Sequence, residues 1–231
     1  MIVPTYNERD GLAELVHAIF SAWDSTADPA LGPIEVIVVD DDSPDGTGVL
    51  ADALARNGRM RVIHRAGRLG LATAVLDGAA AADGEIIAIM DADLSHPPPL
   101  LVELYQTLQR TGADVCIASR YVPGGGTADW SRWRWLLSRL ACWLARPLTP
   151  IRDATSGFLA ARRERVQGMS IGTRGFKIGL ELIVRTAPCV VREVPYVFVG
   201  RTAGQSKMGP REGGRYLRQI ATLYWHQLTR S

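Results

Sequence analysis

The stretch Glu85-Ile86-Ile87-Ala88-Ile89-Met90-Asp91-Ala92-Asp93 decides the fold. A short apolar run that ends abruptly in carboxylates is typical of a buried β-strand followed by a polar turn. Comparable apolar runs lie at residues 34–39, 61–64 and 114–118. Between the runs, residues 12–23, 47–57, 69–82 and 98–111 have the spacing and flanking residues of helices. Strands that alternate with helices predict an α/β fold with a parallel sheet and right-handed crossovers.

Polar clusters follow three of the expected strands, at residues 5–10, 40–46 and 91–96. In an open parallel sheet, ligands bind beyond the carboxyl ends of the strands, where the chain leaves for a helix. We therefore expect these three clusters to converge on one crevice.

Asp91 and Asp93 are the candidate metal ligands. They leave the strand together, and carboxylate oxygens of this kind suit Mg²⁺ or Mn²⁺. Such an ion would bridge a diphosphate and neutralise charge on a departing group. A solvated turn is the alternative interpretation of an isolated Asp-x-Asp pattern.

Three adjacent acids, Asp40, Asp41 and Asp42, follow another fully apolar strand and are costly there unless something binds them. We expect Asp41 to accept hydrogen bonds from a ribose or a base. For Asp45 we favour a role in capping the next helix.

The cluster after the first strand contains Tyr6, Asn7 and Glu8. Here Tyr6 is placed to flank a base and Glu8 to accept hydrogen bonds from it. A helix-capping role for Asn7 is an equally good local account.

After residue 119 the pattern changes. A glycine-rich turn at 124–126 is followed by a Trp- and Arg-rich segment, and residues 155–161 could return to the sheet. A helix over 177–186, a strand over 190–199 and a basic amphipathic tail over 214–229 complete the expected elements. The length and the absence of a clear linker predict one domain, residues 1–231.

The charge is divided unevenly between the two halves of this domain. Residues 1–119 hold 7 basic and 18 acidic side chains, and residues 120–231 hold 19 and 6. This division predicts that the first half holds cations and that the second half faces anions.

Composition excludes several classes of protein. The three cysteines form no Cys-x-x-Cys pair, which argues against disulfides and structural zinc. No apolar run is long enough to span a bilayer, and residues 1–4 lack the features of a signal peptide. We expect a peripheral protein on the cytoplasmic face of a membrane. The first strand is short, which indicates either a trimmed or a late-annotated start.

A membrane surface is the expected partner of the second half. Four of the six tryptophans, Trp130, Trp133, Trp135 and Trp143, are interleaved with arginines, of which Arg132, Arg139 and Arg146 recur every seven residues. Amphipathic rings beside arginines favour the bilayer interface. The tail, with Arg211, Arg215 and Arg218, predicts a second amphipathic helix. Apolar partners at helical spacing favour lipid over nucleic acid.

Motifs along almost the whole chain resemble those of family 2 inverting glycosyltransferases, specifically the dolichol-phosphate (polyprenol-phosphate) mannose synthases. The resemblance rests on Val3-Pro4-Thr5-Tyr6-Asn7-Glu8, Val38-Val39-Asp40-Asp41-Asp42-Ser43-Pro44-Asp45-Gly46-Thr47, Met90-Asp91-Ala92-Asp93-Leu94-Ser95-His96-Pro97, Ser119-Arg120-Tyr121, Asp153-Ala154-Thr155-Ser156-Gly157-Phe158, residues 177–185, Glu193-Val194-Pro195 and residues 201–208.

The resemblance implies a GT-A fold, a Rossmann-like, mostly parallel sheet flanked by helices, with amphipathic interface helices in the C-terminal half. It implies transfer of a hexose, foremost mannose from GDP-mannose, to dolichyl or polyprenyl monophosphate, with Mg²⁺ or Mn²⁺ as cofactor. The implied nucleotide-sugar residues are Pro4, Tyr6, Glu8, Val39, Asp41, Asp91, Ala92, Asp93, Arg120, Arg201 and Lys207. Among these, Asp91, Asp93, Arg201 and Lys207 are the implied catalytic residues, and Asp91 and Asp93 are the implied metal ligands.

Acceptor and membrane contacts are expected from Arg132, Arg139, Asp153, Ser156 and Glu181. Asp153 could instead form an ion pair with an arginine. Lys207 is one of only two lysines in an arginine-rich chain, which favours a specific contact between its ammonium group and a phosphate. Many members of the family carry transmembrane helices after the catalytic domain. Two expectations therefore stay open: a membrane-anchoring partner protein, or a catalytic portion of something longer.

Two positions depart from the family pattern. Leu159 stands where arginine is usual, and Ser95 stands where some members have an amide. Three alternatives also stay open: a UDP-glucose donor, a soluble hydroxyl acceptor and an inactive membrane-bound scaffold. A dinucleotide-binding dehydrogenase is disfavoured because no Gly-x-Gly-x-x-Gly follows the first strand.

Overall fold

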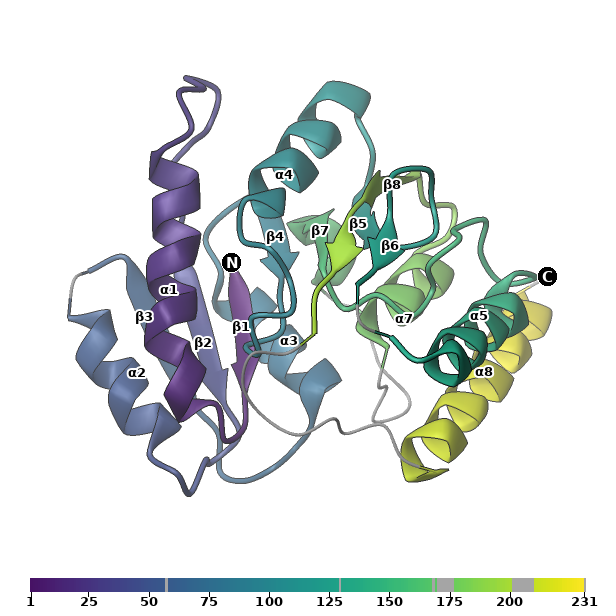
Figure 1. The fold of residues 1–231 in the computed structure, drawn as a ribbon, viewed down its shortest axis with the longest axis horizontal. Coiled ribbons are helices and arrows are strands. Elements are labelled where there is room, and N and C mark those ends of the chain that lie inside the picture. The colour runs from purple at the N-terminus through teal and green to yellow at the C-terminus, as the bar shows by residue number, and fades with distance from the viewer. Residues whose placement is uncertain (57, 129, 168, 170–176, 201–209, 231) are drawn as a thin grey trace.

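The computed structural model describes residues 1–56, 58–128, 130–167, 169, 177–200 and 210–230 (Figure 1). The strands are β1 (Ile2–Thr5), β2 (Val36–Asp40), β3 (Met60–His64), β4 (Ile86–Ile89), β5 (Val115–Ser119), β6 (Gly126–Thr127), β7 (Leu159–Arg162), β8 (Val191–Pro195) and β9 (Val197–Phe198). The helices are α1 (Arg9–Asp24), α2 (Thr47–Ala55), α3 (Leu71–Ala81), α4 (Leu100–Thr111), α5 (Arg132–Ala145), α6 (Arg163–Val166), α7 (Ile178–Arg185) and α8 (Pro210–Arg230).

Within these residues, seven strands form one sheet in the order β3-β2-β1-β4-β7-β5-β8. Neighbouring strands are parallel except β7, which runs antiparallel to both β4 and β5. The α/β fold with a mostly parallel sheet is thereby confirmed. The segment expected to return to the sheet does so as β7, between two strands that precede it in the sequence.

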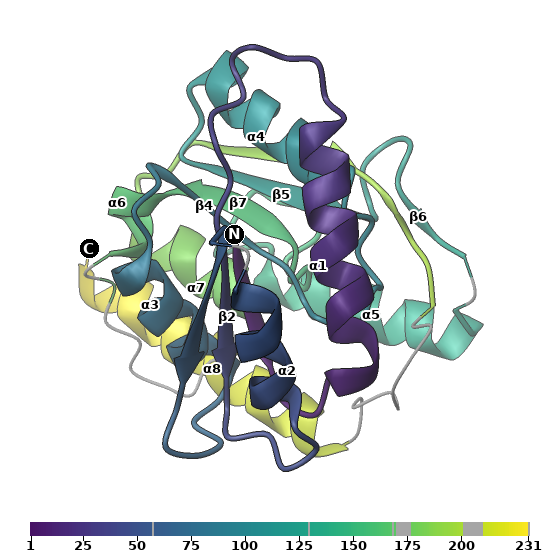
Figure 2. The same cartoon turned by 90° about the vertical axis from the view of Figure 1, so that its left-hand side faces the viewer.

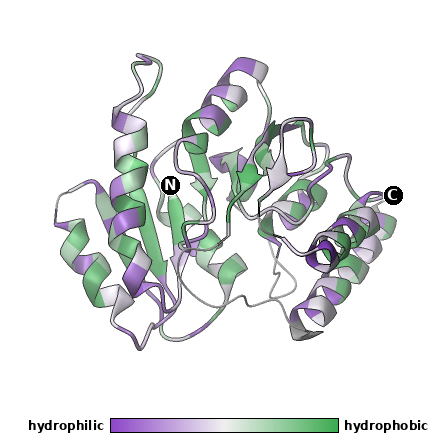
Figure 3. Cartoon of the chain, viewed as in Figure 1, coloured by the Kyte–Doolittle hydropathy of each residue, from purple (hydrophilic) through white to green (hydrophobic). Residues whose placement is uncertain are grey.

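Helices cover both faces of this sheet, so its inner strands are apolar on both sides (Figures 2 and 3). Alternate residues of a strand point to opposite faces. Ile2 and Ile37 pack with apolar residues of α3, α7 and α8 in one cluster. Val3 and Val38 pack with residues of α1, α2 and α4 in the other. This double covering fixes the sheet and leaves its carboxyl edge free for a site.

The strand expected over residues 190–199 is two strands in different sheets, and that expectation was wrong. β8 pairs with β5 in the large sheet, whereas β9 pairs with β6 in a two-stranded sheet. The change occurs at Tyr196, whose N–H donates to the Ser119 carbonyl (3.0 Å) and whose carbonyl accepts from Gly126 (3.0 Å). One residue thus bonds to both sheets, which a local apolar pattern does not reveal.

The basic tail forms α8, as expected, and it packs along α5 (Figure 1). The Tyr216 hydroxyl donates to the Ala141 carbonyl (2.7 Å), and the Tyr224 hydroxyl donates to the Leu144 carbonyl (3.0 Å). Across the described ranges, no helix combines the length and the hydropathy needed to cross a bilayer.

Candidate active site

The loops after β1 and β2 are joined by side-chain hydrogen bonds at the carboxyl edge of the sheet. Three successive backbone N–H groups, of Asn7, Glu8 and Arg9, donate to Ser43 Oγ (3.0 Å), Thr47 Oγ1 (3.0 Å) and Asp45 Oδ2 (3.2 Å). Two of the three polar clusters expected at strand ends therefore lie together, in one fixed arrangement.

The N-cap of α2 is Gly46 and not, as expected, Asp45, but Asp45 bonds to the first residue of that helix. Its carboxylate accepts from the Thr47 backbone N–H (2.9 Å) and from the Thr47 hydroxyl (2.5 Å). Burial would raise the pKa of this carboxyl, but the hydrogen bonds from Thr47 and Arg9 together lower it. At the start of α1 the cap residue is Glu8, and no side chain caps that helix, so the alternative role of Asn7 as a cap is not observed.

The acids Asp40 and Asp41 are compensated by donors from the protein itself. Asp40 accepts from the Thr5 hydroxyl (2.8 Å) and from Ser43. Asp41 pairs with the buried guanidinium of Arg65 and accepts from the Gly70 N–H (2.8 Å). Their burial therefore does not by itself require a ligand, and the nucleotide contact of Asp41 stays a prediction.

A pocket lies where the ends of β1 and β4 meet. Its lining includes Glu8, Ala92 and Asp93, which come from two of the expected clusters and were all candidates for donor binding. The structure thus brings together residues more than 80 positions apart in the sequence. Beside this region, the Arg68 guanidinium lies over the Tyr6 ring, 4.2 Å from its centroid.

The two candidate metal ligands have different surroundings. Asp93 is buried, and its Oδ1 accepts from the Ser95 hydroxyl (2.5 Å) and N–H (3.1 Å). Asp91 is half-buried and faces Gly157, where an added Cβ would lie 3.1 Å from Asp91 Oδ2. A glycine at position 157 therefore leaves the Asp91 carboxylate its space.

Two candidates for the nucleotide pocket are positioned by the sheet itself. Pro4 and Val39 are neighbours in the register between β1 and β2. The side chain of Val39 is fully buried in the core cluster of α3. Because the whole residue is 0% exposed, a direct contact between Val39 and the nucleotide stays a prediction.

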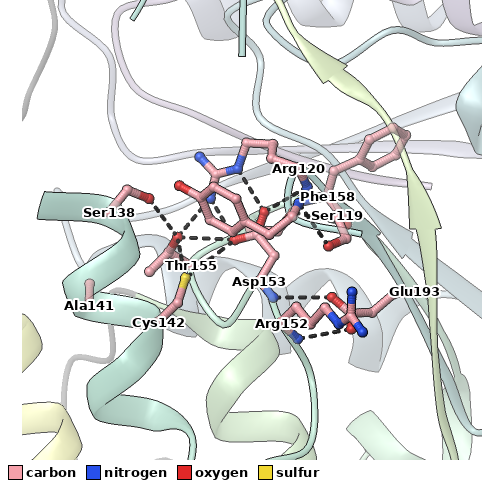
Figure 4. A network of polar contacts seen from close by, with 12 residues as sticks. Ser119, Arg120, Ser138, Ala141, Cys142, Arg152, Asp153, Thr155, Phe158 and Glu193 are labelled. Atoms are coloured by element: carbon pink, nitrogen blue, oxygen red, sulfur yellow. Dashed lines mark hydrogen bonds and ion pairs between the residues drawn. The ribbon is translucent and has the colours of Figure 1, made fainter. Parts of the chain in front are cut away.

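Arg120, which directly follows β5, and Asp153 form a buried ion pair (Figure 4). Asp153 accepts from the Arg120 backbone N–H (2.9 Å), Nε (2.7 Å) and Nη2 (2.6 Å), and Nη2 also donates to the Thr155 hydroxyl. Burial opposes the charge of both groups, but their attraction prevails: the pKa of Asp153 is lowered and that of Arg120 is raised. The ion-pair interpretation of Asp153 is the one observed.

The loop that carries Asp153 is held from β8. The backbone N–H groups of Arg152 and Asp153 donate to the two carboxylate oxygens of Glu193 (2.9 and 3.1 Å; Figure 4). On the other side, the Cys142 and Ser138 side chains of α5 contact Thr155. The network therefore ties three separate elements of the second half together.

Aromatic rings surround Arg120. Its guanidinium lies 4.9 Å from the centroid of Trp130, whose ring also contacts Phe198. Trp130 packs against the core, so its assignment to the membrane interface was wrong. The number of tryptophans in the segment did not distinguish Trp130, whose ring contacts the buried Arg120, from the exposed tryptophans on α5.

Two residues near Asp91 were missed as site candidates. Lys177, at the start of α7, has its pKa lowered by burial and then by the charge of Arg120, while Asp91 and Asp153 oppose the shift. His96 is buried and stacks on Phe158, and burial lowers its pKa against the charges of Asp91 and Asp93. A signal for Lys177 did exist, because it is the other lysine of the chain.

The remaining candidates lie in different places. Ser156 is buried and bonds locally to Phe158, and Glu181 is fully buried and pairs with Arg185. Arg132 and Arg139 are exposed on α5. Arg201 and Lys207 lie outside the described residues.

The paired helices α5 and α8 expose an apolar and basic surface, which we call the α5/α8 face. Its large exposed apolar side chains are Trp133, Trp135, Leu136, Leu137, Leu140, Trp143, Leu217, Trp225 and Leu228. Exposed arginines on the same helices include Arg132, Arg139 and Arg215. Large exposed apolar side chains gathered on two neighbouring helices are typical of an interaction surface.

Comparison with known proteins gives one consistent result. Residues 1–168 match the family model of glycosyl transferase family 2. The chain is 39% identical to the dolichol-phosphate mannosyltransferase of Pyrococcus furiosus over 227 residues, which are 96% of this chain and 62% of that protein. It is 36% identical to the dolichol-phosphate mannosyltransferase of Saccharomyces cerevisiae, with 97% and 86% covered. It is 38% identical to the polyprenol monophosphomannose synthase of Mycolicibacterium smegmatis, with 90% and 80% covered.

Among solved structures, the glucosyl-3-phosphoglycerate synthase of Mycobacterium tuberculosis is similar in fold. Its complex with Mn²⁺, uridine-diphosphate-glucose and phosphoglyceric acid aligns with a TM-score of 0.68 at 22% identity, covering 98% of this chain and 78% of that chain. Together with the mostly parallel sheet, this likeness identifies the fold as GT-A. The expected fold is confirmed.

Proposed function

The chain belongs to glycosyl transferase family 2, and we propose that it transfers mannose from GDP-mannose to a polyprenyl monophosphate, with inversion at the anomeric carbon. The observation that carries this proposal is the pocket at the carboxyl edge. There Glu8 and Asp93 meet, one from the nucleotide motif and one from the diphosphate motif. Support for the donor and acceptor comes from relatives named dolichol-phosphate mannosyltransferase and polyprenol monophosphomannose synthase.

Asp91 and Asp93 would hold a divalent ion, Mg²⁺ or Mn²⁺, at this edge. The donor set fits such an ion, because both supply carboxylate oxygens and Gly157 leaves space at Asp91. Among the described residues there is no group of three side chains able to hold a metal, so diphosphate and water oxygens would complete the coordination. A bound ion would neutralise charge on the departing nucleoside diphosphate.

The acceptor needs little activation by the protein. A phosphate monoester has a second pKa of about 6, so most of the acceptor phosphate is already a dianionic nucleophile at neutral pH. The protein then has to attract and orient the dianion, for which it offers Lys177 and the arginines of α5. Asp153 is engaged with Arg120, so a role as general base is not part of the proposal.

The α5/α8 face would bring the enzyme to its lipid substrate. Tryptophans such as Trp133 and Trp143 suit the headgroup region of a bilayer, and the neighbouring arginines suit anionic headgroups. We propose peripheral binding at the cytoplasmic face of the membrane. Binding of the chain alone to vesicles would show that no anchoring partner protein is required.

Lipid extraction tests the proposed function. The chain is incubated with labelled GDP-mannose, Mn²⁺ and polyprenyl phosphate in vesicles, and the label is partitioned between water and organic solvent. We expect an organic-soluble, acid-labile product, which is lost in Asp91→Asn. Label that enters lipid only from UDP-glucose would change the donor. Label confined to a water-soluble product would replace the acceptor, and turnover equal in wild type and Asp91→Asn would contradict the proposed metal site.

A further inference from the structure

The buried face of α8 contains one polar residue among apolar ones. Tyr216, Ile220 and Leu223 lie at helical spacing against the core, and Gln219 lies among them with 2% of its surface exposed. A buried side-chain amide is costly unless its donors and acceptor are satisfied. The bonds of Gln219 therefore indicate why glutamine occupies a core position.

Those bonds converge on the first turn of α7. Gln219 Oε1 accepts from the Lys177 backbone N–H (3.2 Å), and Gln219 Nε2 donates to the Lys177 carbonyl (3.1 Å). Nε2 also donates to Glu181 Oε1 (3.2 Å). The amide thus holds both backbone groups of one residue, as a neighbouring strand would, and bonds to a side chain one turn further along.

The residue that is held in this way belongs to the charged centre of the proposed site. Lys177 interacts electrostatically with Arg120, Asp91 and Asp153. Glu181, which accepts the third hydrogen bond of Gln219, is fully buried and salt-bridged to Arg185 (2.5 Å). Glu181 is therefore a fixed hydrogen-bond partner for the amide. A change in the Gln219 side chain would therefore be transmitted to Lys177 through its backbone.

We propose that Gln219 is a positioning residue, which fixes the backbone of Lys177 so that its ammonium group meets the phosphate of the lipid acceptor. This inference rests on the proposed function and adds to it a role for α8 inside the site. Gln219 itself touches no substrate. It acts through Lys177, at the junction between α8 and the carboxyl edge of the sheet.

The two lysines of the chain allow a test that needs no substrate. Protein labelled with ¹³C at lysine Cε gives two side-chain signals, which are assigned with Lys207→Arg. At one fixed pH, Gln219→Met should move the Lys177 signal. The control is Tyr216→Phe, which removes a hydrogen bond from the same face of α8 to Ala141 and leaves Lys177 untouched. If Gln219→Met does not fold, Gln219→Asn shortens the side chain and retains its polarity.

Kinetics then separate positioning from mere stability. Gln219→Met should lower kcat/KM for polyprenyl phosphate by about tenfold to a hundredfold, without change in the KM for GDP-mannose, since misplacement of a contact group has effects of that size. In a Lys177→Met background the same substitution should have no further effect. Tyr216→Phe should leave both constants unchanged.

The outcomes distinguish this inference from the function on which it rests. Wild-type protein that labels no lipid would overturn the proposed function, and the NMR comparison would still test the position of Lys177. A Lys177 signal that does not respond to Gln219→Met would overturn the inference. So would a loss of acceptor kcat/KM that persists undiminished in the Lys177→Met background.

Discussion

Replacing Asp153 by alanine tests the buried network most severely. The Asp153 side chain is 0% exposed and that of Arg120 is 6% exposed, and three donors of Arg120 converge on the one carboxylate. Asp153→Ala would leave the guanidinium buried beside the Trp130 ring and without its counter-ion. A charge in that position cannot be rehydrated without opening the packing around it.

The cost follows from this geometry. Breaking a buried ion pair by removing one partner costs about 3–5 kcal/mol of unfolding free energy, because the remaining charge is uncompensated. For a chain of this length, each kcal/mol lowers Tm by about 2–4 °C. We expect Asp153→Ala to lower Tm by about 6–20 °C.

Differential scanning calorimetry at neutral pH measures this effect, with a surface ion pair as the control. Asp24 and Arg59 are also linked by a two-pronged salt bridge, but their side chains are 52% and 42% exposed. Asp24→Ala should hardly change Tm because the guanidinium of Arg59 that remains is exposed and stays hydrated. The reasoning is refuted if Asp153→Ala lowers Tm no further than Asp24→Ala does.

Three further predictions follow from the site and the surface. Burial opposes the charge of Asp153, but Arg120 keeps its pKa below the ordinary value of about 3.9, so the ionised carboxylate stabilises the fold above that pH. The free energy of unfolding, measured by urea titration, should therefore fall as the pH drops through the lowered pKa, and Asp153→Asn should flatten this dependence. Gly157→Ala places a Cβ 3.1 Å from Asp91 Oδ2, so turnover should fall at nearly unchanged Tm, and equal turnover would contradict the proposed role of Asp91. Trp143→Ser should weaken sedimentation with vesicles that contain phosphatidylglycerol, whereas Val49→Ser, on α2, should not; equal binding by both would contradict docking through the α5/α8 face.

Local sequence patterns predicted the elements that carry the donor motifs. The run 85–90 and the acids after it became β4 and the carboxyl edge, because a buried parallel strand needs apolar residues on both faces. Asp45 bonds to the first residue of α2, although the N-cap of that helix is Gly46. These features depend on neighbours in the sequence, which periodicity and capping rules describe.

Contacts between distant segments were not predictable in this way. Nothing local places β7 antiparallel between β4 and β5, or gives Asp41 the partner Arg65. Trp130 and Trp143 lie in the same Trp- and Arg-rich segment, yet the ring of Trp130 packs against the core beside Arg120 and that of Trp143 is exposed. Each of these depends on which segments meet after folding, and so does the position of Lys177 near Asp91.

The central claim is that Asp91 and Asp93 hold a divalent ion against the diphosphate of the donor. Isothermal titration calorimetry of GDP tests it directly, with Mn²⁺ present and then removed by EDTA, for wild type, Asp91→Asn and Asp93→Asn. We predict that GDP binds wild type only with Mn²⁺ present and that each variant binds it at least about tenfold more weakly, a difference of about 1.4 kcal/mol. Equal affinity with and without Mn²⁺, or in wild type and both variants, would contradict the account.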